Sequence, residues 1–349
     1  MPIGMEFLLP QRSRVPIYLD MASIDPQSGP SGALSEPGYL ALLRSGELAR
    51  RVQMARDQMA ACDLCARYCR VNRFETLDGV ACRTGAEARV SSYGPDYSGE
   101  DSVRGVNASG VIAFSWCNMR CVYCETSYMS WQGEGGDTSA RQLADMMLDI
   151  QKQGCHNINL LSPSHVVFQI LEAVLIAAKD GLVLPLVYNS GGYDSLEALT
   201  LLNGVIDIYI PDMKYGSSET ARKYSKVEDY VATNRAAVRE MHAQVGDLVI
   251  DKNGIARRGL LVRHLLLPDG LADTDQILKF LALEISPNTH LNLMNEYRPS
   301  NKTGSFPEIN HRPSISDLKK AQELTVKYGL NRLETPLPAW MAKEIPAFT

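Results

Sequence analysis

From about residue 109 onward, short runs of apolar residues alternate with longer segments in which apolar residues recur at helical spacing. The runs are nearly continuous in aliphatic residues, which is typical of strands buried on both faces of a parallel sheet. They cover residues 111–116, 156–162, 184–190, 205–213, 259–268 and 289–296. The helical patterns cover residues 138–153, 164–180, 194–203, 217–244, 273–285 and 316–328. Strands that each lead into a helix predict an α/β fold.

The number of these units decides which α/β architecture to expect. Six strands are too few for the usual eight-stranded closed barrel, so the pattern predicts a partial (β/α)6 barrel of the TIM type. In this architecture the functional residues lie at the carboxyl ends of the strands. Polar residues that directly follow an apolar run are therefore the candidates for a functional site.

The chain upstream of the barrel divides into segments of different composition. Residues 21–38 are rich in Gly, Pro and Ser and predict a loop or arm, whereas residues 39–60 show the spacing of a helix. A segment with four cysteines follows. We therefore predict an N-terminal arm and helix (1–60), a four-cysteine metal module (61–108), the barrel (109–330) and an irregular C-terminal tail (331–349).

The overall composition narrows the function. With 349 residues, of which 45% are hydrophobic and 21% charged, the chain has the composition of a globular protein. A formal net charge of −5 provides no broad basic surface, which disfavours a nucleic-acid partner. The first twenty residues lack the apolar core of a secretory signal, and the most apolar stretch, 166–188, is interrupted by charged residues, so we expect neither export nor a membrane span. Eight cysteines without an export signal predict metal or redox roles in a reducing cytoplasm.

Three of these cysteines stand directly after the first predicted strand. Cys117, Cys121 and Cys124 have the spacing C-x3-C-x2-C and supply three thiolates. An iron–sulfur cube has four irons that need a ligand each, so this set leaves one iron open. A zinc site is the alternative, but it needs four protein ligands, and the next candidates are Cys155 and His156, far along the chain. The spacing therefore favours a [4Fe–4S] cluster with an open coordination position.

The same motif carries a resemblance to a known family. C-x3-C-x2-C at the end of the first strand, with Tyr123 before the last cysteine, resembles the signature of the radical S-adenosylmethionine superfamily. The order of motifs between residues 60 and 330 resembles the pyruvate formate-lyase activating enzyme-like subgroup. The resemblance implies that S-adenosylmethionine binds the open iron beside Tyr123, and that its reductive cleavage gives a 5′-deoxyadenosyl radical for hydrogen abstraction. It further implies an oxidoreductase that receives electrons from a donor such as flavodoxin or ferredoxin and activates a glycyl radical enzyme.

Other functions remain open. One is radical modification of a small molecule or of another protein, because similar folds host many substrates. A different class is a non-enzymatic iron–sulfur protein in electron transfer, whose fourth coordination position would be closed. Radical RNA methylases carry a further cysteine near the C-terminus, and no cysteine follows Cys155, which disfavours that activity.

Polar residues also follow the second and third predicted strands. The resembled family carries a Gly-Gly-Glu segment after the second strand that contacts the cofactor; here that place reads Ser162-Pro163-Ser164, so Ser162 is the expected contact. His165 opens the next helix and is expected to be structural. After the third strand, Asn189 begins Asn-Ser-Gly-Gly-Tyr, which resembles the Asn-Gly-Tyr segment of activating enzymes and makes Asn189 a candidate cofactor ligand. The paired glycines suit either a close ligand or an ordinary turn.

The later strands carry charged residues. Strand alternation places Asp212 and Lys214 on one face, and a charged pair that closes an apolar strand is costly unless it is used or solvated. The pair resembles the Asp-x-Lys of activating enzymes, in which the lysine meets the cofactor carboxylate and the aspartate organises the neighbouring site. Arg263 lies among leucines and needs an anion, either a cofactor or substrate carboxylate or a structural salt bridge. On the sixth strand, the candidates for the substrate side are Asn292, Asn295, Glu296 and Tyr297.

A second cysteine set precedes the barrel. It is complete, with four members spaced C-x2-C-x3-C-x12-C: Cys62, Cys65, Cys69 and Cys82. Such local sets are metal sites, and both a zinc ion and an auxiliary iron–sulfur cluster accept four thiolates. The C-x2-C spacing favours zinc and a structural role. The segment resembles the N-terminal module of the same subgroup, while Cys155 is expected to be a buried thiol.

Overall fold

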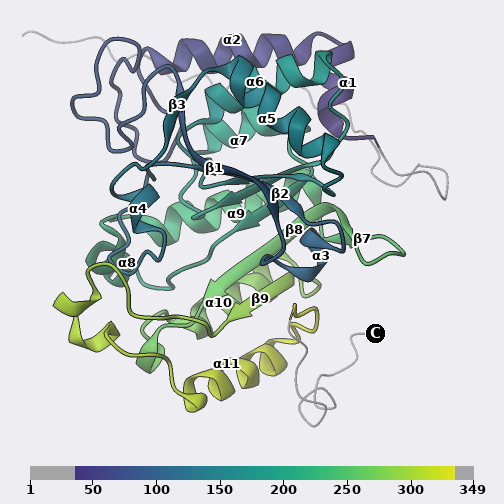
Figure 1. The fold of residues 1–349 in the computed structure, drawn as a ribbon. Coiled ribbons are helices and arrows are strands. Elements are labelled where there is room, and N and C mark those ends of the chain that lie inside the picture. The colour runs from purple at the N-terminus through teal and green to yellow at the C-terminus, as the bar shows by residue number, and fades with distance from the viewer. Residues whose placement is uncertain (1–35, 335–349) are drawn as a thin grey trace, which may run out of the picture. The chain divides into compact units, whose positions relative to one another are not determined.

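The computed structural model describes residues 36–334, so the predicted arm up to residue 35 and most of the predicted tail lie outside the described residues. Six parallel strands form the centre of the fold (Figure 1). They are β2 (Ser109–Phe114), β4 (Ile158–Leu161), β5 (Leu186–Ser190), β6 (Ile208–Pro211), β8 (Ala256–Leu265) and β9 (His290–Met294). Each pairs in parallel with the next one named. All six predicted strands are confirmed, and so is the partial barrel.

The barrel remains open because antiparallel strands occupy its edge. β1 (Ala88–Asp96) pairs with β2, and β3 (Gly136–Thr138) pairs with β1. A short hairpin strand, β7 (Val249–Ile250), pairs with β8. The apolar pattern did not predict these three strands, which are exposed on one side or very short. β1 lies inside the predicted 61–108 segment and joins that segment to the barrel sheet.

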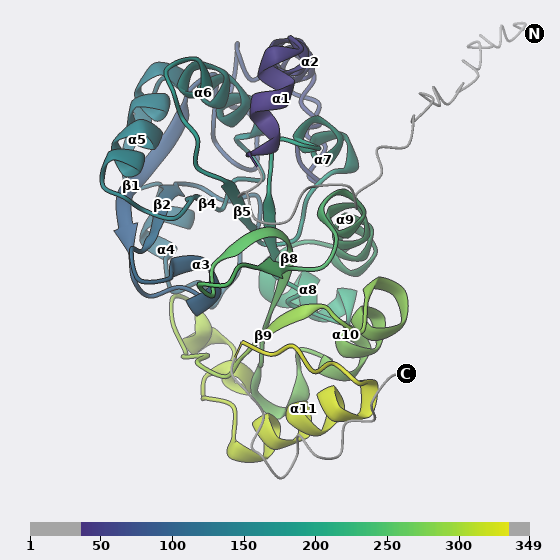
Figure 2. The ribbon, with the colours of Figure 1, turned by 90° about the vertical axis from the view of Figure 1, so that its right-hand side faces the viewer.

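The helices that follow the strands cover the outside of the sheet (Figure 2). They are α5 (Ala140–Lys152), α6 (Val167–Lys179), α7 (Leu196–Leu202), α8 (Ser218–Ser225), α9 (Tyr230–Val245), α10 (Thr274–Phe280) and α11 (Ile315–Tyr328). The helix predicted over 217–244 is two helices, because Lys226 adopts a left-handed conformation (φ 58°) that ends α8. A π-helical turn (Leu281–Ile285) extends α10, and three 3-10 turns cover Pro268–Gly270, Thr303–Ser305 and Pro307–Ile309.

The N-terminal helical segment is also divided. α1 (Gly38–Arg44) and α2 (Glu47–Met59) are separated at Gly46, whose φ of 78° a side chain would disfavour. Two short helices, α3 (Asp101–Arg104) and α4 (Ser127–Ser130), lie in the connections around β2. No helix among residues 36–334 has the length and apolarity needed to cross a membrane.

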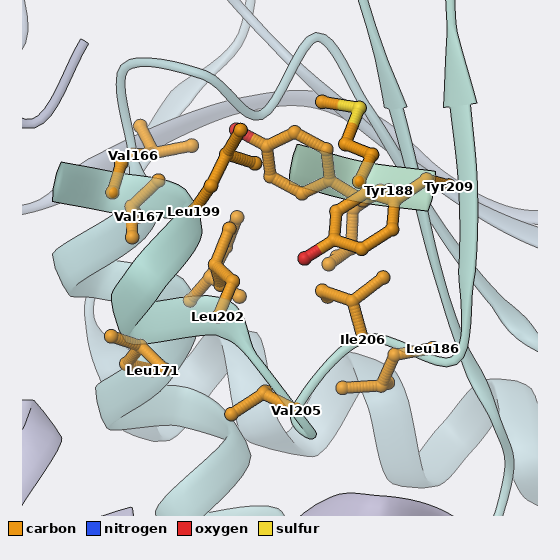
Figure 3. Close-up of a cluster of buried hydrophobic side chains, with 14 of the residues drawn as sticks. Val166, Val167, Leu171, Leu186, Tyr188, Leu199, Leu202, Val205, Ile206 and Tyr209 are labelled. Atoms are coloured by element: carbon orange, nitrogen blue, oxygen red, sulfur yellow. The ribbon is translucent and has the colours of Figure 1, made fainter. Parts of the chain in front are cut away.

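The main core lies between the sheet and its outer helices. Figure 3 shows one part of it, where Tyr188 and Tyr209 from β5 and β6 meet Leu199 and Leu202 of α7. Burying one aliphatic side chain of this size stabilises the fold by about 1.5–3 kcal/mol. The buried tyrosine hydroxyls have partners: that of Tyr188 donates to Asp194 and that of Tyr209 donates to Gln244. This layer holds the strands in register and so positions the residues at their carboxyl ends.

Candidate cluster and cofactor site

A cavity of about 670 Å³ lies at the carboxyl ends of the strands. Its wall combines the loop after β2, the ends of β6, β8 and β9, and the segment 98–101 between β1 and α3. Among the lining residues are Cys121, Tyr123, Cys124, Asp212, Lys214, Arg263, Asn292, Glu296 and Tyr297. The cavity therefore collects most of the predicted site residues from four separate parts of the chain.

The three cysteines of the β2 loop lie at this cavity. Cys121 and Cys124 line it, whereas Cys117 is half-buried in the same loop. The loop is clamped to the end of α8, since the backbone N–H of Arg120 donates to Ser225 (3.0 Å) and that of Val122 donates to Tyr224 (2.7 Å). The sequence pattern predicted the loop but not this clamp.

Every sulfur in the loop has a hydrogen-bonding neighbour. The backbone N–H of Met119 lies 3.4 Å from Cys117 Sγ. The hydroxyl oxygens of Ser225 and Ser130 lie 3.0 Å from the sulfurs of Cys121 and Cys124, respectively. Hydrogen bonds of this kind favour an ionised sulfur, while burial raises the pKa of Cys117 to about 12. Without a metal the Cys117 thiol is therefore neutral, and a bound metal would ionise it.

A zinc ion and an iron–sulfur cube require different distances between their cysteine ligands. Within residues 36–334, no three His, Cys, Asp or Glu side chains converge closely enough to hold a single ion. Around zinc all ligands stand at about 2.3 Å from one centre. In a cube each thiolate binds a different iron, so the sulfurs stand farther apart.

A hydrogen-bonded chain leads from the cysteine loop into the aromatic wall. Ser225 Oγ, beside Cys121, lies 2.6 Å from the hydroxyl of Tyr215, which lies 2.7 Å from that of Tyr123. The rings of Tyr123 and Tyr297 meet edge to face with centroids 5.6 Å apart. Tyr123 was a predicted site residue, but Tyr215 and Ser225 were not. Neither residue belongs to a motif that marks it in the sequence, and both reach Cys121 only through the fold.

Asp212 and Lys214 form the predicted pair on one face of the strand end. Lys214 Nζ donates to Asp212 Oδ2 at 2.6 Å, and their side chains are only 17% and 20% exposed. Burial opposes the charge of Lys214, but the carboxylate of Asp212 and the neighbouring Cys121 outweigh it and raise the pKa of Lys214. Lys214 thus stays protonated beside the cysteine loop, while Asp212 balances its charge.

Arg263 has an anionic partner within the protein. Its Nε lies 2.9 Å from Oε1 of Glu100, although the angle is not that of a hydrogen bond, and the Glu100 side chain is 3% exposed. Arg263 Nη1 also donates to Asn189 Oδ1 at 3.2 Å, and Asn292 donates to Glu100. The sequence left open whether the anion is a ligand or a salt-bridge partner. The structure supplies Glu100, which precedes α3 and carries no sequence signal of this role.

The remaining predicted residues have local structural contacts. Ser162 has a left-handed backbone (φ 59°), and its N–H donates to the carbonyl of Asn189 (2.9 Å). Neither Ser162 nor Asn189 is among the residues that line the cavity. Gly192 has a φ of 70°, and a Cβ there would lie 2.2 Å from the carbonyl oxygen of Asp212, so this glycine serves close packing between strand ends.

Two further expectations concern His165 and the sixth strand. His165 is buried, with Nε2 2.9 Å from the carbonyl oxygen of Ser115, and burial lowers its pKa to about 3. Burial therefore favours the neutral form of its imidazole, and its contact with the β2 loop is compatible with the expected structural role. Asn292, Glu296 and Tyr297 line the cavity, whereas Asn295 is not among the lining residues.

Comparisons with known proteins add the following. No family model matches the chain. An uncharacterized protein of Methanocaldococcus jannaschii is 28% identical over 292 residues, which cover 80% of this chain and 79% of that protein.

Several solved structures are also similar. The [FeFe]-hydrogenase maturase HydG of Carboxydothermus hydrogenoformans matches with a TM-score of 0.45 and 16% identity, over 66% of this chain and 54% of HydG. A radical SAM methyltransferase of Sphaerobacter thermophilus matches with a TM-score of 0.43 and 13% identity, over 83% and 89% of the two chains. Methylornithine synthase PylB matches with a TM-score of 0.43 and 15% identity, over 86% of this chain and 75% of PylB. These similarities are too low to assign an activity, which is argued below from the site.

Proposed function

We propose that this chain is a radical S-adenosylmethionine enzyme that abstracts hydrogen from its substrate. The observation that carries the proposal is the position of Cys121 and Cys124 in the wall of the strand-end cavity, with the Asp212–Lys214 pair in the same wall. A set of three thiolates that opens into a cavity suits a cluster whose fourth iron meets a ligand there. A hydrogen-bonding group stands at each of the three sulfurs, and the hydroxyls of Ser225 and Ser130 would donate to thiolates at Cys121 and Cys124, which supports thiolate ligation.

The cavity also suits S-adenosylmethionine, which carries an ammonium, a sulfonium and a carboxylate. Lys214 would bind the carboxylate, with Asp212 holding the lysine side chain in place. Acidic residues outnumber basic ones in the wall, which favours the two positive groups: the wall contains Glu100, Asp101, Glu125, Asp212, Glu296 and Glu334 beside Lys214 and Arg263. A volume of about 670 Å³ is in the range of small-molecule sites.

When bound, the reduced cluster would supply one electron to the sulfonium, giving methionine and the 5′-deoxyadenosyl radical. The chain's own residues hold and shield the reactants. Tyr123 and Tyr297, which are 5% and 2% exposed, exclude water from one wall. Glu100 and Arg263 line the cavity as an ion pair, and Asn189, which lies outside the lining, holds Arg263 by accepting from Nη1 while its own carbonyl accepts from the N–H of Ser162.

Within this class, activation of a glycyl radical enzyme is the finer proposal, with a flavodoxin or ferredoxin as the electron donor. It rests on the motif resemblance. Radical modification of a small molecule or of another protein is the alternative. A deuterium label followed from a candidate substrate into 5′-deoxyadenosine distinguishes them: transfer from a glycine of a partner chain supports activation, and transfer from a small molecule refutes it.

The class itself is tested by anaerobic reconstitution with iron and sulfide, reduction, addition of S-adenosylmethionine and chromatography for 5′-deoxyadenosine. We expect product from the wild type and from Cys155→Ala, which removes a buried thiol outside both cysteine sets. We expect none from Cys121→Ala. A spectroscopically intact cluster in the wild type without any 5′-deoxyadenosine would refute the enzyme and favour an iron–sulfur protein of electron transfer.

A further inference from the structure

We infer that Cys62, Cys65, Cys69 and Cys82 bind a second iron–sulfur cluster, and that Arg73 is its buried counter-charge. This site lies outside the cavity and does not depend on S-adenosylmethionine chemistry. The experiments that test it are therefore independent of those that test the proposed function.

The backbone gathers these cysteines in a strained arrangement. The N–H of Cys62 donates to the carbonyl of Val71 (3.0 Å), and the N–H of Arg70 donates to the carbonyl of Cys62 (2.9 Å), so the loop closes on itself. Three non-glycine residues beside Cys69 and Cys82 have left-handed conformations: Tyr68, Arg70 and Arg83, with φ of 44°, 56° and 49°. Such conformations cost about 1–3 kcal/mol each and persist where the surroundings impose them, as ligand sites do.

The thiols have the environment of metal ligands. Cys62, Cys65 and Cys82 are buried, and Cys69 is half-buried. A backbone N–H two residues further along favours the ionised sulfur at two positions, that of Arg67 at Cys65 and that of Thr84 at Cys82. The same relation holds between Met119 and Cys117 in the β2 loop.

Arg73 is the second, independent observation. It is 3% exposed; its Nε donates to the carbonyl of Thr84 (2.7 Å), its Nη1 lies 3.5 Å from Cys62 Sγ, and its Nη2 has no partner among residues 36–334. Among residues 36–334 no Asp or Glu side chain forms an ion pair with Arg73, and the group in contact with its Nη1 that can become an anion is the Cys62 thiol. A buried cation of this kind is strongly destabilising unless an anion neutralises it.

Metal binding is what would make these sulfurs anionic. Neutral thiols would leave the buried guanidinium of Arg73 without a compensating charge. Four thiolates around an Fe–S core carry a net negative charge, which Arg73 would partly neutralise. The guanidinium would also direct an N–H group at the Cys62 ligand.

The spacing favours a cluster over zinc. Four thiolates on one zinc ion, each at about 2.3 Å, would bring their sulfurs to about 3.8 Å from one another. In the part of the chain that the structure describes, no three potential ligands converge to hold a single ion. The four cysteines nevertheless lie in one loop that closes on itself through the hydrogen bonds of Cys62 with Val71 and Arg70, and a wider gathering of this kind suits ligands of four different irons.

The test separates the two cysteine sets. In full-length protein carrying Cys117→Ala, Cys121→Ala and Cys124→Ala, reconstituted anaerobically, we expect about four irons and four sulfides per chain. Adding Cys65→Ala and Cys82→Ala should remove them, whereas adding Cys155→Ala should not. One zinc per chain without iron, or a folded protein without metal, overturns the proposal. As an independent measurement that needs no variant, the wild type should contain about eight irons per chain; about four irons, with or without zinc, overturns it.

Arg73 has its own readout. In the triple variant, Arg73→Met should shift the midpoint potential of the remaining cluster to a more negative value, because a positive charge beside the cluster favours the reduced state. Arg73→Lys should shift it less. An unchanged potential in Arg73→Met, with the iron content retained, overturns the counter-charge role.

Discussion

The two cysteine regions of this protein use similar local chemistry with opposite surroundings. In the β2 loop, two of the three cysteines line a cavity of about 670 Å³, and Lys214 in the same wall is held by Asp212. In the upstream module the buried Arg73 contacts the sulfur of Cys62, and within residues 36–334 it forms no ion pair with a carboxylate. The set of three cysteines is the one that adjoins a cavity, whereas the set of four lies outside it. A cluster held by three thiolates has a free coordination position that can bind a reacting ligand. A cluster held by four thiolates has none, which suits electron transfer or a structural role.

The largest expected effect separates the two regions directly. Cys121→Ala should abolish the loop cluster and 5′-deoxyadenosine formation while leaving the iron of the module in place, because the two sets share no ligand. Iron analysis and product chromatography measure both. If Cys121→Ala removes all iron from a folded chain, the two regions are not independent sites.

The next effect concerns the buried ion pair of the cavity wall. Glu100→Gln leaves Arg263 without its anion and should lower the free energy of unfolding by about 3 kcal/mol, since removing one partner of a buried pair leaves the other charge uncompensated. Denaturant titration measures it. The double variant Glu100→Gln with Arg263→Gln should recover part of the loss. Equal stability of the single variant and the wild type would show that Arg263 is neutralised by another group.

A smaller effect is expected for the cavity lysine. Lys214→Met should weaken binding of S-adenosylmethionine to the reconstituted protein by about 10- to 100-fold, the value of a hydrogen bond to a charged group of about 1.5–3 kcal/mol. Lys214→Arg keeps the charge and should lose less. Equilibrium dialysis measures the affinity. Unaltered affinity in Lys214→Met, with the cluster intact, would place the carboxylate of the cofactor elsewhere.

The smallest effect tests the contact between Ser225 and Cys121. Ser225→Ala removes the hydroxyl beside Cys121 and Tyr215 and should lower the free energy of unfolding by about 1 kcal/mol. It should also make the potential of the loop cluster more negative, because the ligand sulfur loses a hydrogen bond. Thr200→Ala, which removes an exposed hydroxyl on α7, is a control for stability. A potential equal to that of the wild type would show that the hydroxyl does not act on the cluster.

The sequence predicted those features that depend on neighbouring residues or on a repeating apolar pattern. Strands buried on both faces must be apolar throughout, so all six parallel strands were visible as apolar runs. Strands with one exposed face lack that signal, and β1 was missed. The break between α8 and α9 depends on one left-handed residue, Lys226, which the apolar spacing does not reveal.

The same distinction applies to the site. The two cysteine sets and the Asp212–Lys214 pair were visible in the sequence, because residues a few positions apart are held together by the chain. Their long-range partners depend on the fold: Ser225 is 104 residues from Cys121, and Glu100 precedes the barrel in the chain whereas Arg263 belongs to its fifth strand. These contacts depend on strands that are adjacent in the sheet and distant in the chain. Hydrophobic pattern specifies which strands are buried, but the partner of a polar side chain follows from where the packed strands end.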